Sequence, residues 1–163
     1  MSFLNLLFAS KFISKYSSTF NAINIALKHD GVLILEGPAL LPCIKFNIYD
    51  QFYCEHIYVF STISLKQILK KYDFEIFDLK NLSTHGGSTR YFIKKKINKR
   101  IKIYNSVNKE INKEITFGLS KFSTYKKFAK NVKKSKLKLI SILKQLKSSK
   151  KKVIGYGATA KSC

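Results

Sequence analysis

Acidic residues are scarce in this chain of 163 residues, where nine Asp and Glu oppose 31 Lys and Arg and leave a formal charge of +22. A charge of that size suggests a polyanionic partner such as nucleic acid. Arginine, however, is scarcer still, since only Arg90 and Arg100 occur among the basic residues. Base readout and bidentate phosphate contacts favour the arginine guanidinium. Because Ile, Asn, Phe and Tyr are abundant, as A+T-rich codon usage produces, we interpret the charge as codon bias on a solvated helical face and do not expect nucleic acid as the partner.

Cysteine and long apolar runs are also rare. Cys43, Cys54 and Cys163 form no C-x-x-C pair and leave an odd cysteine over. That pattern argues against a disulfide framework or a structural zinc site, and it favours a reducing compartment, the cytoplasm. The apolar start, residues 1–9, is short and lacks a basic leading region, so we expect a core strand there instead of a signal peptide or a membrane span.

Alternating helix and strand signals in the first part of the chain indicate an α/β fold. Phe20, Ile23 and Leu27 fall on one face of a helix, and a fully apolar run follows the Asp30-Gly31 turn, as expected for a strand buried on both faces of a sheet. The expected elements are, in order, a helix over 19–28, a strand over 32–35, a helix over 64–72, and strands over 75–79 and 89–93. The last two strands are close enough to form an antiparallel pair at one edge of the sheet.

Beyond residue 98 the sequence changes to long lysine-rich helices, in which only Glu110 and Glu114 are acidic. This asymmetry predicts a domain boundary, with one partial domain over 1–96 and the start of a second over 97–163. An apolar stripe over residues 139–146 predicts core packing or a helix–helix seam. The run that begins at Val153 and enters a glycine turn predicts the first strand and loop of another α/β unit.

Side chains suited to proton transfer gather in two short segments, residues 49–56 and residues 84–88. In the first, a glutamate precedes a histidine, whose unperturbed pKa lies near neutral pH and whose tautomer a carboxylate can hold. In the second, a histidine precedes two glycines, which allow the backbone to approach a ligand closely. Taken alone, each segment is more typical of a surface loop than of a site.

In order, however, these segments resemble the S-adenosylmethionine-dependent nucleotide-sugar C-methyltransferases. The similar strings are Tyr49-Asp50-Gln51-Phe52-Tyr53-Cys54-Glu55-His56, Phe60-Ser61, Leu65-Lys66-x-Ile68-Leu69, Thr84-His85-Gly86-Gly87-Ser88-x-Arg90 and Gly155-Tyr156-Gly157-Ala158-Thr159-Ala160-Lys161. The resemblance covers about residues 19–161. It implies the C-terminal half of a class I methyltransferase (Rossmann-like) sheet, followed by Lys-rich helices and the start of a second α/β unit, the C-terminal substrate domain.

The resemblance also implies a mechanism, in which a base removes the proton beside a keto group of a nucleotide-linked sugar and the enolate attacks the methyl group of S-adenosylmethionine. His56 would be the base, Glu55 would orient it or share its role, and Tyr53 would hydrogen-bond the sugar oxygen or help line the methyl-transfer site. The substrate-binding residues that the resemblance implies are His85, Gly86, Gly87, Arg90, Gly155, Tyr156 and Gly157. For Arg90, a phosphate contact and a structural ion pair are both open.

The sequence departs from the family at both ends. Members carry an N-terminal cysteine-rich zinc segment and a glycine-rich loop for the cofactor, and neither motif occurs in this sequence. We therefore expect a piece truncated at both ends, with no metal of its own and no activity by itself. A non-enzymatic polyanion-binding protein and an inactive remnant domain are the alternative interpretations.

Overall fold

The computed structural model describes residues 3–7, 16–53, 56, 58–155 and 157. The chain divides into two compact units, Met1–Ser120 and Lys121–Cys163. Within the described ranges, no helix is both long enough and apolar enough to cross a membrane.

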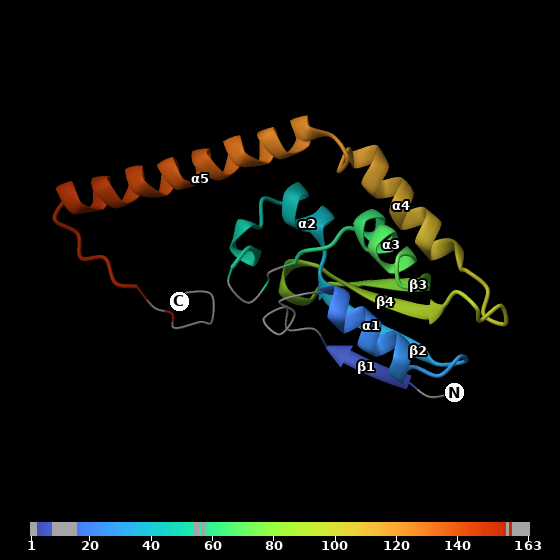
Figure 1. The fold of residues 1–163 in the computed structure, drawn as a ribbon. Helices are drawn as coiled ribbons and strands as arrows, with labels where there is room; N and C mark the ends of the chain where they lie inside the picture. The colour runs from blue at the N-terminus through green and yellow to red at the C-terminus, as the bar shows by residue number, and fades with distance from the viewer. Residues whose placement is uncertain (1–2, 8–15, 54–55, 57, 156, 158–163) are drawn as a thin grey trace. The chain divides into compact units, whose positions relative to one another are not determined.

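The first unit contains a four-stranded sheet in the order β1-β2-β4-β3 (Figure 1). Its strands are β1 (Phe3–Leu7), β2 (Val32–Pro38), β3 (Phe74–Leu82) and β4 (Ser88–Lys95). β1 and β2 are parallel, whereas β4 is antiparallel to both of its neighbours, β2 and β3. The expected antiparallel pair at the sheet edge is thus confirmed, and β3 is the edge strand.

One face of the sheet carries the hydrophobic core. Leu33 of β2 lies opposite Ile93 of β4, and both side chains are fully buried. Helices α1 (Tyr16–Ala26), α3 (Thr62–Lys70) and α4 (Asn105–Phe117) contribute the rest of the core. The helical residues in this cluster are Phe20, Ile23, Leu65, Leu69 and Val107, joined by Leu27 just beyond α1. The predicted α1 face is confirmed, and burial on this scale stabilises each large side chain by about 1.5–3 kcal/mol.

Helix α3 begins at a capping box. The Ser61 hydroxyl accepts a hydrogen bond from the Ser64 amide at 3.1 Å, and the Ser64 hydroxyl accepts one from the Ser61 amide at 3.1 Å. These two bonds satisfy amides that a helix start leaves without partners. The cap fixes the point at which the preceding loop enters the helix.

The segment between β2 and α3 is more ordered than the sequence indicates. It contains α2 (Leu40–Lys45) and the 3-10 turn η2 (Tyr49–Gln51). Its two ends meet at a bridge between Ala39 and Phe60, where the Leu40 amide donates to the Phe60 carbonyl at 3.0 Å. A six-residue helix is too short to leave a clear apolar period, so the sequence predicts only a loop here.

Helix α4 belongs to the first unit, although the sequence places a domain boundary near residue 97. It is held against β3, because the Tyr104 amide donates to the Phe77 carbonyl at 2.8 Å and the Ser106 hydroxyl donates to Asp78 at 2.5 Å. The division between compact units falls after Ser120 instead. The functional assignment of the two predicted domains stays a prediction.

The second unit contains α5 (Phe122–Ser148). The predicted apolar stripe lies on this helix, but Leu139 is 55% exposed, and Ile142 and Leu143 are 43% and 42% exposed. The strand expected at Val153 and Ile154 is wrong, since both residues are exposed coil. Two apolar residues without a partner strand are too few to form a strand by themselves.

Candidate active site

The candidate site is built from two loops of the first unit, one that follows helix α2 and one that follows strand β3. The His56 loop, residues 46–61, runs from α2 to the start of α3, and the His85 loop, residues 83–87, joins β3 to β4. The two are adjacent at their bases, because the Ala39 amide, which precedes α2, donates to the Gly87 carbonyl at 3.1 Å. The order of the sheet therefore brings together two segments that are separated by some 30 residues of sequence.

His56 is half-buried, and its own loop fixes its orientation. Its Nδ1 lies 3.0 Å from the Gln51 carbonyl oxygen, and its ring centroid lies 4.5 Å from that of Tyr53. The His56 amide also donates to the Tyr53 carbonyl at 2.9 Å. A carbonyl oxygen only accepts, so the hydrogen bond to Gln51 places the proton of a neutral ring on Nδ1. Nε2 then carries a lone pair and can accept a proton.

Some of the predicted site lies outside the described residues. Glu55 and its neighbour Cys54 belong to that part, and so does the side chain of His85, whose backbone forms the 3-10 turn η3 (Thr84–Gly86). The roles predicted for Glu55 and for the His85 imidazole therefore stay predictions.

The two glycines of the His85 loop have backbone conformations that other residues rarely adopt. Gly86 has φ 84° and Gly87 has φ 130°. A Cβ atom on Gly87 would lie only 2.7 Å from Cγ of Pro42 in α2, and one on Gly86 would lie 3.0 Å from Cδ1 of Ile48. The glycines thus allow the His85 loop to pack directly against the segment that leads into the His56 loop.

Arg90 forms an ion pair in this structure. Its Nε lies 2.7 Å from Oε2 of Glu36, its partner across β2 and β4, and its side chain is 43% exposed. Arg90 alternates with Thr89 and Tyr91 along β4, so it points to the sheet face opposite the core. The ion pair corresponds to the structural alternative that the sequence leaves open for this residue.

The three remaining predicted residues, Gly155, Tyr156 and Gly157, lie in the second unit. Gly155 and Gly157 are exposed, and Tyr156 is outside the described residues. Their predicted contact with a substrate stays a prediction.

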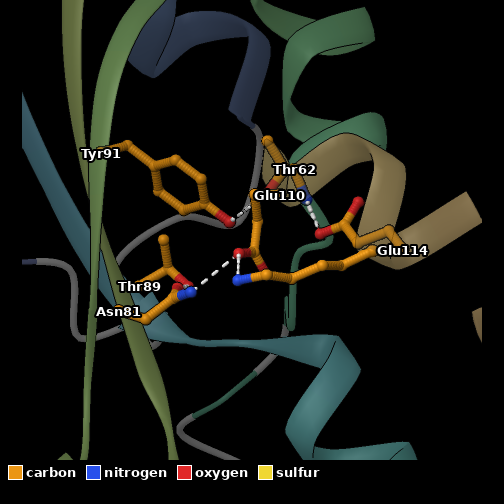
Figure 2. Close-up of polar contacts among 7 residues, drawn as sticks. Thr62, Asn81, Thr89, Tyr91, Glu110 and Glu114 are labelled. Atoms are coloured by element: carbon orange, nitrogen blue, oxygen red, sulfur yellow. Dashed lines mark hydrogen bonds and ion pairs between the residues drawn. The ribbon is translucent and has the colours of Figure 1, made fainter. Parts of the chain in front are cut away.

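The structure also contains a buried polar cluster that the sequence analysis did not assign to the site (Figure 2). Its centre is Glu114 of α4, which is 3% exposed. The Thr62 amide donates to Glu114 Oε1 at 2.6 Å, and the Ile63 amide donates to Oε2 at 2.9 Å. One carboxylate from α4 therefore binds two consecutive amides at the start of α3, where a negative charge is favoured.

Glu110, one helical turn earlier, makes the second set of contacts in this cluster. Its Oε2 accepts from Asn81 Nδ2 at 2.8 Å and from Lys113 Nζ at 3.0 Å (Figure 2). Asn81 in turn accepts from the Thr89 hydroxyl at 2.9 Å. Asn81 and Thr89 are cross-strand partners next to the end of the β3–β4 ladder, directly beside the His85 loop.

Burial determines the protonation behaviour of this cluster. It raises the pKa of Glu114 above its usual value, an effect that hydrogen bonds from Ile63 and Thr62 oppose and the charge of Glu110 increases. Burial also raises the pKa of Tyr91, whose hydroxyl lies 3.4 Å from Oγ1 of Thr62. Tyr91 is thus a neutral hydrogen-bonding group at neutral pH.

A signal for the cluster does exist in the sequence. Glu110 and Glu114 are the only acidic residues after Asp78, and their i,i+4 spacing places them on one helical face. Two isolated acids on one face of a lysine-rich helix are candidates for a specific contact.

Comparison with known proteins agrees with the motif order. The family model of the C-methyltransferase C-terminal domain matches residues 83–163. "C-methyltransferase NovU" of Streptomyces niveus is 26% identical over 141 residues, which cover 86% of this chain and 33% of that relative. This chain is therefore similar to C-methyltransferases, and residues 83–163 match their C-terminal domain. It spans about a third of the length of the relative it matches.

These matches confirm the resemblance to C-methyltransferases. Among the described residues of this chain, no group of three or more His, Cys, Asp or Glu side chains could hold a metal ion.

Proposed function

We propose that this chain forms part of an enzyme that transfers a methyl group from S-adenosylmethionine to the carbon beside the keto group of a nucleotide-linked sugar. The observation that carries the proposal is the pairing of His56 with Tyr53 in a loop whose Gln51 carbonyl holds the imidazole in a base-competent tautomer. The match to the C-methyltransferase C-terminal domain supports the reaction class.

The sheet supports the more specific fold that we propose, the closing half of a class I methyltransferase sheet. In that half, a buried strand and an active-site loop are followed by a helix and an antiparallel strand pair. Here β2, the His56 loop, α3 and the β3–β4 pair occur in the same order. The candidate base then follows the strand end at which α/β proteins commonly bind ligands.

In the proposed reaction, Nε2 of His56 takes the proton from the carbon beside the keto group. The electrons of the broken C–H bond move to the carbonyl and give an enolate, and Nδ1–H keeps its hydrogen bond to the Gln51 carbonyl throughout. The ring ends as a cation, which Glu55 would stabilise and orient. Tyr53 would donate a hydrogen bond to the sugar oxygen, and such donors are most effective where charge develops.

S-adenosylmethionine, when bound, supplies the electrophilic methyl group. The described residues contain no glycine-rich loop that could hold its nucleoside, so we assign no residue of this chain to the cofactor and derive no step through it. Zinc, which family members bind in an N-terminal cysteine-rich segment, has no role in the proposal.

The substrate would lie against the His85 loop, whose glycines keep the backbone free of side chains. We propose that His85, Gly86 and Gly87 contact the sugar. Arg90 is a weaker candidate for a phosphate contact, because its Nε is bound to Glu36. For the loop at Gly155, Tyr156 and Gly157 we propose a contact with the nucleotide.

Methyl transfer by a fusion protein tests this proposal. The fusion would join this chain to the remaining segments of a C-methyltransferase relative, and the assay would measure radioactive methyl incorporation into a nucleotide-linked keto sugar. We expect His56→Gln to lower kcat by about 10²–10⁴-fold, the usual contribution of a general base. The matched control is His29→Gln, because His29 is an exposed histidine at the turn before β2. Turnover within a few-fold of the parent fusion in His56→Gln would contradict the base assignment.

A further inference from the structure

Glu114 connects α4 to the end of the His56 loop. Its carboxylate binds the amides of Thr62 and Ile63, and the residue just before them, Ser61, is the last residue of the loop. Thr62 is 1% exposed, so water does not compete for this contact. Hydrogen bonds to a charged group are stronger than those between neutral groups, so this pair can hold the end of the loop in one position.

Two further contacts lie between Thr62 and His56 in the sequence. Phe60, two residues before Thr62, accepts a hydrogen bond from Leu40 at the other end of the segment. The ring of Tyr58 stacks on that of Phe60, with 5.7 Å between the centroids. The position of Thr62 therefore bears on how the chain returns from His56 to the sheet.

Glu110 connects the same helix to the His85 loop. Its carboxylate binds Asn81, which binds Thr89 across the hairpin, and only the pair Leu82 and Ser88 separates this link from the loop itself. Figure 2 shows the two glutamates reaching from α4, one towards Asn81 and the other towards Thr62. Residues four apart on a helix differ by about 6 Å in rise, so α4 sets a fixed spacing between the two contacts.

The carboxylates of Glu110 and Glu114 are buried and therefore need hydrogen-bond partners. Glu110 is 6% exposed and Glu114 is 3% exposed, and a buried carboxylate is costly unless it is hydrogen-bonded. Simple packing of α4 would need only apolar residues such as Val107, which is 2% exposed. The polar contacts instead fix one position of α4 relative to the ends of both loops.

We infer that Glu110 and Glu114 are positioning residues for the active site, with Glu114 fixing the return of the His56 loop and Glu110 fixing the base of the His85 loop. This inference rests on the proposed function of the two loops. It assigns to α4, a helix that contributes no proposed catalytic residue, the task of holding His56 and the glycine loop in register.

Amide hydrogen exchange and histidine NMR on the 163-residue chain test the inference without substrate. Four reporter amides do not contact either glutamate. Those of Leu40 and His56 report on the His56 loop, and those of Ala39 and Gly87 report on the His85 loop. We expect Glu114→Ala to speed exchange at the first pair at least tenfold more than at the second, and Glu110→Ala to do the reverse.

The nitrogen chemical shifts of His56 give a second readout that a loss of stability alone would not move. We expect a single tautomer with the proton on Nδ1 in the parent chain and in Glu110→Ala, and a mixture of tautomers in Glu114→Ala. Glu114→Gln keeps one acceptor oxygen, so its effect should be intermediate. This conservative variant decides the question if Glu114→Ala does not fold.

Glu75→Gln is the matched control. Glu75 pairs with Lys94 at 3.3 Å, near the end of the β3–β4 hairpin away from the His85 loop, and Lys94 is buried. Its replacement should cost stability while leaving the ratio of exchange rates and the His56 tautomer unchanged. Equal effects of both glutamate variants on both pairs of amides, or an unchanged His56 in Glu114→Ala and Glu114→Gln, would overturn the positioning roles. Such a result would leave the methyl-transfer proposal standing, whereas a failed fusion assay with the expected exchange and tautomer changes would leave the two glutamates holding the loops but remove the catalytic role of those loops.

Discussion

Helices α4 and α5 come from the same lysine-rich part of the chain, yet they differ in how many side chains they bury. α4 buries Val107, Glu110 and Glu114 and is bound to β3 and α3. α5, whose residues are all described, is more than twice as long and buries no residue. The difference shows that a high lysine content does not prevent a helix from burying side chains. In α4 the buried residues, Val107, Glu110 and Glu114, lie on one face.

Among the variants that test this comparison, Glu114→Ala in α4 should lower the free energy of unfolding most. The buried Thr62 amide and the half-buried Ile63 amide lose their partner, at roughly 1–3 kcal/mol each, so we expect the free energy of unfolding to fall by about 3 kcal/mol. Gln145→Ala on α5 should change it by less than about 0.5 kcal/mol, because Gln145 is exposed. Urea denaturation followed by circular dichroism measures both variants. A Glu114→Ala variant as stable as Gln145→Ala would show that the α4 contacts do not hold this unit together.

A smaller effect is expected from apolar truncation. Val107→Ala removes two buried methyl groups, and we expect a loss of about 2 kcal/mol from burial and the cavity left behind. Leu139→Ala on α5 removes a larger side chain that is 55% exposed, and it should cost less than about 0.5 kcal/mol. The same denaturation experiment compares the two. If Leu139→Ala were the more damaging variant, the apolar stripe of α5 would be packed in solution.

The smallest expected effect is a pH dependence that arises from Glu114. Its pKa is raised in the folded state, so the folded chain binds this proton more tightly than the unfolded chain does. The resulting stabilisation is complete below the usual pKa of 4.5 and is lost as the pH rises through the folded-state pKa.

Glu114→Gln isolates this term, because glutamine does not titrate. The free energy of unfolding of the parent chain, minus that of Glu114→Gln, should decline as the pH rises from about 4.5. Denaturation at a series of pH values measures it. A difference that grows with pH would mean that the charged form of Glu114 is the one the fold prefers.

Much of the first unit can be predicted from local sequence. The Phe20, Ile23 and Leu27 face, the apolar β2 run and the hairpin all follow from periodicity and turn residues, and each is present. Local signals suffice there because each element buries one continuous apolar surface.

Tertiary contacts account for the features that the sequence does not reveal. The position of α4 depends on bonds from Tyr104 and Ser106 to β3, and no periodicity encodes them. The candidate base could be named from the order of motifs. The Gln51 carbonyl that orients this base could not be predicted, because every residue has a backbone carbonyl and the sequence does not indicate which one contacts the ring.

The central claim is that His56 removes the proton beside the keto group. The most direct test is proton exchange in D₂O, measured by NMR on a nucleotide-linked keto sugar with the fusion protein and no methyl donor. We predict exchange at the carbon beside the keto group in the parent fusion and in His29→Gln, and a loss of at least about 10²-fold in His56→Gln. Exchange at the same rate in His56→Gln would contradict the claim.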